Sequence, residues 1–109
     1  MAYNGATAIR LPRHIEATDG VESMTITTNL ELTYSSAQYL LLKNVTGALN
    51  CTLPAHRSGG YFWILNRSSS SHSITVNRPD GGGGAATLAA GECGLFVCDG
   101  IIWELMIKA

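Results

Sequence analysis

Residues 94–107, GLFVCDGIIWELMI, contain one apolar run before Asp99-Gly100 and one after it. An Asp-Gly pair between two such runs is a strong signal for a tight β-hairpin, because both residues tolerate the left-handed backbone that the turn needs. In the second run the odd-numbered residues 101–107 are Ile, Trp, Leu and Ile, so they share one face of a strand. The stretch predicts a hairpin with an apolar face turned toward a core.

The chain upstream of this hairpin shows the same style, with short apolar runs between strong turn signals. Residues 48–53 alternate and end at Pro54, residues 61–65 are the most aromatic run, and residues 72–77 alternate again. No window has a helical apolar period longer than about two turns. We therefore expect an all-β protein, a small jelly-roll-like β-sandwich or barrel of about 7–8 strands. The expected core draws on Leu40, Leu42, Leu49, Leu53, Phe62, Ile64, Ile74, Val76, Leu88, Phe96, Trp103 and Leu105.

The first part of the chain differs from the rest. Residues 1–23 contain few large apolar side chains, a basic pair and an acidic trio, so we expect an extended N-terminal arm. Residues 24–109 are expected to form one β-sandwich domain. Residues 24–33 are β-prone and alternate, which lets them join the sheet or lie along a neighbouring chain.

The composition excludes several classes of partner. Seven basic and eight acidic residues give a net charge of −1 with no block of either sign, which argues against nucleic-acid binding. The apolar runs, such as residues 39–42, are far too short to span a membrane, and the N-terminus lacks the apolar stretch of a signal peptide. Apolar residues make up 46% and charged residues only 14%, which predicts surface buried between subunits.

The motifs of enzyme chemistry are incomplete in this sequence. Ser58 lies outside any G-x-S-x-G motif, the glycine run 81–84 lacks a following Lys-Ser/Thr, and the three cysteines fit no zinc spacing. The acidic residues 92, 99 and 104 are close in sequence, but turn and strand-face roles account for them. We expect no enzyme, no catalytic residue, no cofactor and no metal. Three Asn-x-Ser/Thr triplets, beginning at residues 44, 50 and 66, are interpreted as chance matches to the glycosylation pattern.

A series of β-strand features along the chain gives the sequence a resemblance to a known family. They are Thr52-Leu53-Pro54, Gly59-Gly60 before the aromatic run ending at Asn66, residues 73–76, residues 86–88, Gly91-Glu92, residues 96–100 and the Trp103 strand. With these features, residues 35–109 resemble small virion proteins of tailed bacteriophages, especially capsid decoration (head cement) proteins. The β-rich domains of phage tail fibres share the same style.

The resemblance implies a structural role in the virion. The expectation is a homotrimer on the outer capsid surface that clamps neighbouring subunits of the major capsid protein, assembled in the host bacterial cytoplasm. Such proteins have no catalytic residues, and the N-terminal arm would reach the capsid or the next protomer. Tyr61 and Trp63 alternate on the strand face opposite Phe62 and suit a contact surface. The candidate capsid or subunit contacts are Arg10, Pro12, Arg13, Ile26, Leu30, Leu32, Tyr61 and Trp63.

Two other functions fit the same sequence. One is a receptor- or carbohydrate-binding domain of a tail fibre or baseplate, which would use Tyr61, Trp63 and the Ser-rich and Gly-rich loops. Against it, the chain starts with its own methionine and has no long repetitive shaft, so we expect a complete small protein. The other is a small cupin-like enzyme, which needs a metal triad that histidines 14, 56 and 72 do not provide in their polar or loop contexts.

Overall fold

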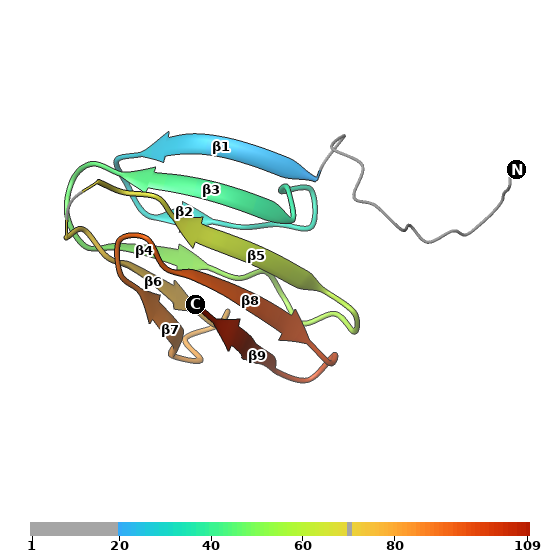
Figure 1. The fold of residues 1–109 in the computed structure, drawn as a ribbon. Coiled ribbons are helices and arrows are strands. Elements are labelled where there is room, and N and C mark those ends of the chain that lie inside the picture. Colours follow the sequence, from blue (N-terminus) through green and yellow to red (C-terminus); the bar gives the residue numbers. More distant parts are fainter. Residues whose placement is uncertain (1–19, 70) are drawn as a thin grey trace, which may run out of the picture.

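The computed structural model describes residues 20–69 and 71–109, and all the regular structure in them is β. The expectation of an all-β protein is confirmed, although the described residues form nine strands instead of 7–8 (Figure 1). None of them forms a helix of the length and hydropathy needed to cross a bilayer. The strands are β1 (Val21–Ile26), β2 (Leu30–Glu31), β3 (Tyr39–Asn44), β4 (Leu49–Thr52), β5 (Tyr61–Asn66), β6 (Ile74–Asn77), β7 (Gly84–Leu88), β8 (Cys93–Cys98) and β9 (Trp103–Lys108).

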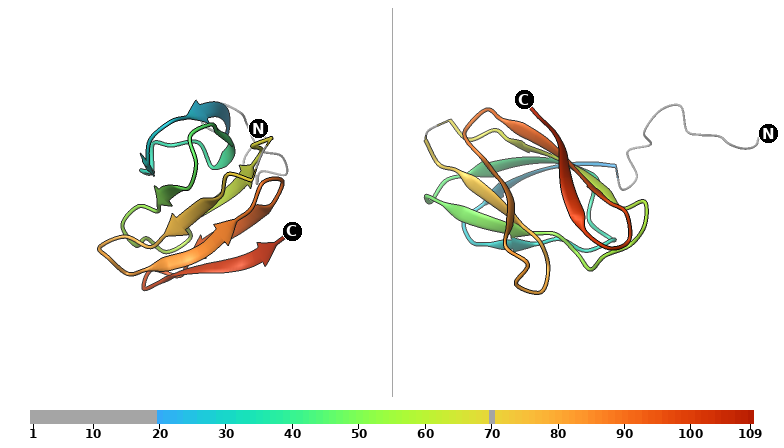
Figure 2. Two further views of the ribbon diagram at one scale, coloured as in Figure 1. Left: turned by 90° about the vertical axis from the view of Figure 1, so that its left-hand side faces the viewer. Right: turned by 90° about the horizontal axis from the view of Figure 1, so that it is seen from below.

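The strands form two sheets that lie face to face (Figure 2). Sheet A has the order β1-β3-β5-β8-β9, and sheet B has the order β2-β4-β6-β7. From β1 to β6 the chain alternates between the sheets, and neighbouring strands of this part are parallel within each sheet. The chain therefore winds as a two-sheet coil, in which each turn contributes one strand to each sheet.

The last three strands reverse direction and complete both sheets. Strand β7 pairs antiparallel with β6, β8 pairs antiparallel with β5, and β9 pairs antiparallel with β8. The hairpin expected at Asp99-Gly100 is confirmed between β8 and β9, and the glycine run 81–84 connects β6 to β7 as a second hairpin. Gly100 has φ = 100°, which is the left-handed backbone for which glycine is suited.

The strand connections differ from those of the expected jelly roll. A jelly roll is built from antiparallel Greek keys, whereas four of the seven strand pairings here are parallel and the two sheets do not close into a barrel. The alternation of apolar residues indicates which face of a strand is buried, but it does not indicate which strand lies beside it. Turns that cross between the layers, instead of hairpins within one layer, produce the coil.

The core lies between the two sheets and largely matches the prediction. Of the twelve expected side chains, only Leu49 and Leu105 are half-buried, and both pack against the core. The core also includes Ile26, Leu32 and Ala37, which the prediction omitted, together with Cys51 and Cys98. Burial raises the pKa of the Cys51 thiol to about 12, so this cysteine behaves as an apolar core residue.

The expected boundary between arm and domain at residue 23 is wrong. Residues 21–23 form the first half of β1, which pairs with β3 from Val21 to Ile26. Segment 24–33 belongs to the same coil, since β2 pairs with β4 and Leu32 is buried. The domain thus includes residues 21–23, and residues 1–19 of the proposed arm lie outside the described residues.

Two asparagines tie the strand ends of sheet A to sheet B. Asn44 ends β3 and Asn66 ends β5, and their side chains are 2% and 0% exposed. The Asn44 Nδ2 donates to the Ser73 carbonyl at 3.0 Å, and the Asn66 Nδ2 donates to the Leu88 carbonyl at 2.9 Å. Ser73 precedes β6 and Leu88 ends β7, so each amide bridges the two layers.

The same two asparagines also shape the chain that follows them. The Asn44 Oδ1 accepts from the Thr46 backbone N–H at 3.0 Å, and the Asn66 Oδ1 accepts from the Ser68 backbone N–H at 3.1 Å. Ser68 joins the two turns, because its Oγ accepts from the Asn44 N–H at 2.8 Å and donates to the Asn66 Oδ1 at 2.7 Å. Two of the three Asn-x-Ser/Thr triplets thus have a structural role as turns at the corners of the coil.

Candidate functional site

The outer face of sheet A, which points away from the core, is apolar over most of β3, β5 and β8, and one apolar residue on each edge strand extends this surface. Alternate side chains of β3, β5 and β8 fill the core, and the intervening apolar ones face outward and are only half-buried. Val21 on β1 and Ile107 on β9 extend this face to both edges, and each is 50% exposed. The apolar residues of the outer face are Val21, Tyr39, Leu41, Tyr61, Trp63, Leu65, Cys93, Leu95, Val97 and Ile107.

Strand register places these residues in rows that cross the sheet. One row runs from edge to edge through Val21, Tyr39, Trp63, Leu95 and Ile107. Neighbouring strands lie about 4.8 Å apart, so the five side chains of this row form a continuous apolar band. The row beside it continues the apolar surface through residues 41, 65 and 93.

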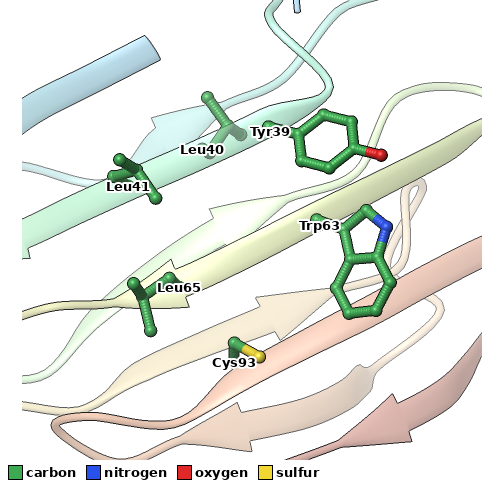
Figure 3. Close-up of a pocket in the computed structure, with 6 residues that line it drawn as sticks. All are labelled: Tyr39, Leu40, Leu41, Trp63, Leu65 and Cys93. Atoms are coloured by element: carbon green, nitrogen blue, oxygen red, sulfur yellow. The ribbon is translucent and has the colours of Figure 1, made fainter. Parts of the chain in front are cut away.

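A hollow of about 210 Å³ opens on this face, and its lining is almost wholly apolar. Figure 3 shows Tyr39 and Leu41 from β3, Trp63 and Leu65 from β5, and Cys93 from β8 around it. Apolar walls without converging donors and acceptors suit an apolar side chain, whereas a polar ligand needs hydrogen-bond partners. The hollow is therefore a recess for an apolar group.

Tyr39 lies at one border of the hollow and packs against Tyr61. The rings of Tyr39 and Tyr61 pack edge to face, with centroids 6.4 Å apart and an interplanar angle of 86°. Burial raises the pKa of the Tyr61 hydroxyl, and the neighbouring Tyr39 raises it further. Both effects keep Tyr61 neutral, so this border adds no charge to the face.

The structure separates the residues that the sequence grouped as contact candidates. Tyr61 and Trp63 lie on the outer face, as their alternation with Phe62 predicts. Ile26 and Leu32, by contrast, are 7% and 5% exposed inside the domain, so the prediction that they contact another protein is wrong. Their apolar side chains belong to the core that the first turn of the coil encloses. Leu30 is half-buried and packs against the core, and Arg10, Pro12 and Arg13 lie outside the described residues.

Most of the outer face was missing from the sequence-based candidates. Residues 39–42 and 94–98 are continuous apolar runs, which are typical of strands covered on both faces. That continuity is a signal for a second contact surface. The sequence-based candidates took only Tyr61 and Trp63 from this face and did not include Tyr39, Leu41 or Leu95.

The three C-terminal carboxylates are engaged in local interactions. Glu92 accepts from the Ala89 backbone N–H at 2.9 Å and pairs with Lys108 at 3.5 Å, and Glu104 pairs with Arg78 at 3.5 Å. Asp99 is the cap of the β8–β9 turn. Within residues 20–69 and 71–109, no three His, Cys, Asp or Glu side chains are grouped as metal ligands would be.

The pH dependence of stability is expected to reflect the hydrogen bonds that the Asp99 carboxylate makes in the β8–β9 turn. Its Oδ1 accepts from the backbone N–H groups of Ile101 and Ile102 at 2.8 and 3.0 Å. These bonds, that from Ile102 foremost, hold the pKa of Asp99 below its ordinary value. A folded-state pKa below the unfolded one gives stability that is present above the unfolded pKa and lost as the pH falls through the folded pKa.

We therefore expect the protein to lose stability below about pH 4, and Asp99→Asn to flatten that loss. Urea unfolding of both proteins at several pH values between about 5 and 3 measures the difference. Equal slopes of unfolding free energy against pH for the two proteins would contradict a contribution from Asp99.

No protein-family model matches this chain, and no curated protein or solved structure matches it. Function is therefore inferred from the residues and their geometry.

Proposed function

We propose that the protein is a structural virion protein, a homotrimeric capsid decoration protein that binds the outer surface of a phage head and stabilises the lattice of the major capsid protein. The observation that supports this proposal most strongly is the outer face of sheet A. A monomeric protein gains nothing from an apolar band that runs across an entire sheet and includes both edge strands, whereas an assembly subunit buries it.

The polar residues support the same function. The described carboxylates at positions 92, 99 and 104 stabilise turns and pair with basic side chains, and the buried asparagines bridge the two sheets. These interactions are internal to the domain and stabilise the coil. A domain stabilised in this way suits a rigid subunit in a lattice. The resemblance of residues 35–109 to decoration proteins names the kind of assembly.

Co-sedimentation with phage heads tests the proposal. Purified protein is mixed with expanded heads and with unexpanded proheads of the phage whose genome encodes it, and the pellet is analysed for bound protein. We expect saturable binding to the expanded heads at a fixed ratio to the major capsid protein, and stable heads at a higher temperature. Failure to bind expanded heads would refute the decoration role.

A second candidate function is a receptor- or carbohydrate-binding domain of a tail fibre or baseplate. The observation that favours it is that Trp63 lines an open hollow and that Tyr61, also half-buried, lies on the same face of β5. The apolar lining of that hollow disfavours a sugar, whose hydroxyls require polar partners. Binding on a glycan array that disappears in Trp63→Ala would support this alternative.

A further inference from the structure

We infer that a neighbouring copy of this chain covers the outer face of sheet A, an inference that rests on the proposed role as an assembly subunit. The row through residues 21, 39, 63, 95 and 107 extends from one edge of the sheet to the other. Its two end residues, Val21 and Ile107, are each half exposed in the single chain. A partner that buries the whole row must therefore cover the full width of the sheet.

The size of the face fits an interface between subunits. Ten apolar positions, each covering roughly 4.8 Å by 6.7 Å of the sheet, give an apolar area of roughly 320 Å² within a face of roughly 500 Å². The apolar part is within the range of the largest apolar patches on monomers, about 300–600 Å², which often have a function, and the rest of the face is polar. Together with a polar rim, the face approaches the roughly 800 Å² that each partner contributes to a stable complex.

Charged residues lie on this face outside the apolar row and at the sheet edges. Lys43 at the end of β3 and Glu104 on β9 are exposed, and Glu104 is paired with Arg78. On the other edge, Glu22 is in register with the buried Leu40, so a charged side chain occupies the core side of β1. An inward-facing charge protects an edge strand from pairing with another chain. Association is therefore expected through the face, not by extension of sheet A at β1.

The face also complements itself. Trp63 and the hollow beside it both belong to the centre of the sheet, since β5 is the middle strand of sheet A. A large aromatic side chain beside an apolar recess allows Trp63 of one copy to contact the recess of the next copy, and three such contacts close a ring around a threefold axis. Because the net charge of the chain is only −1, two copies repel each other little. A second copy is thus the partner that this surface fits.

Substitutions on the outer face test the inference without touching the core. Trp63→Glu adds a carboxylate to the middle of the row, and Ile107→Glu adds one at its end, where the side chain is already 50% exposed. The matched control is Ile101→Glu, which adds the same charge at a residue that is 80% exposed in the β8–β9 turn. Circular dichroism and thermal unfolding establish that each variant is folded.

Light scattering then measures the mass of each protein across a range of concentrations. We expect the wild type and Ile101→Glu at about three times 11.6 kDa and Trp63→Glu at 11.6 kDa. Ile107→Glu changes a side chain that is already half exposed, so it disturbs the fold less than Trp63→Glu does. We expect it to raise the dissociation constant of the oligomer at least about a hundredfold. The Cys93 thiol, which lines the hollow, is expected to react with a thiol reagent faster in the Trp63→Glu variant than in the wild type.

The outcomes separate this inference from the proposed function. A monomeric wild type, or folded Trp63→Glu and Ile107→Glu variants that keep the mass of the wild type, would overturn the inference. If a monomeric wild type still binds expanded heads and Trp63→Glu does not, the capsid covers the face and the decoration role stands. If the wild type is an oligomer of the expected mass but binds no heads, the inference stands and the decoration role fails.

Discussion

Replacing Asn66 with alanine is expected to lower the free energy of unfolding by about 4 kcal/mol, because the change leaves several buried polar groups without partners. The Asn66 amide is fully buried and makes four hydrogen bonds, to the carbonyls of His72 and Leu88 and from the N–H and Oγ of Ser68. Each buried group that loses its partner costs about 1–3 kcal/mol. The corner between sheets A and B is therefore expected to weaken more than the lost volume alone predicts.

Urea unfolding followed by far-ultraviolet circular dichroism measures this cost. Asn50→Ala is the matched control, because Asn50 is exposed and its side chain accepts a single hydrogen bond, from Asn77, at 2.9 Å. We expect that control to cost less than about 1 kcal/mol. Asn66→Asp keeps the shape but places an oxygen opposite the Leu88 and His72 carbonyls, so it is expected to be as costly as the alanine. Equal losses for Asn66→Ala and Asn50→Ala would contradict the bridging role.

The asparagine corner also shows what the sequence was able to predict about the fold. Alternation in residues 61–65 and 72–77 correctly gave the strands and their buried faces, because the side-chain period of a strand is a local property. The parallel coil was not predictable in this way, because it depends on which turns cross between the layers. In the sequence, residues 44–46 and 66–68 match a glycosylation pattern. Their role as turns emerges only when Ser73 and Leu88 lie opposite them.

Prediction of the candidate site had a similar limit. The sequence correctly placed Tyr61 and Trp63 on a surface, because Phe62 between them belongs to the core. Ile26 and Leu32 have the same alternation, but they are buried, since the domain is wide enough to include β1 and β2. The row through Val21 and Ile107 joins residues that are far apart in the sequence, and only strand register brings them onto one face.

The largest loss of stability is expected for Trp103→Ala, at about 5 kcal/mol. Trp103 is the largest fully buried side chain of the described residues, and it packs against Phe62 with ring centroids 5.9 Å apart. A buried tryptophan replaced by alanine costs about 3–5 kcal/mol through lost contacts and the cavity that remains. Its Nε1 also donates to the Pro54 carbonyl at 2.8 Å, so the variant leaves a buried acceptor unpaired.

Trp103→Phe separates the two contributions, because it keeps most of the volume and removes only the hydrogen bond and part of the ring. The loop that carries Pro54 passes close over the indole, since a Cβ added at Gly60 would lie 3.1 Å from the ring. The loop cannot collapse onto a smaller side chain without moving β5. We therefore expect the phenylalanine variant to lose about 2 kcal/mol of unfolding free energy. The alanine variant is expected to lose so much of it that the protein is barely folded. Urea unfolding of the three proteins, with calorimetry as a second measurement, gives the order of stability. If phenylalanine costs as much as alanine, packing between Trp103 and Phe62 is not the main contribution, and the hydrogen bond to Pro54 holds this end of the coil.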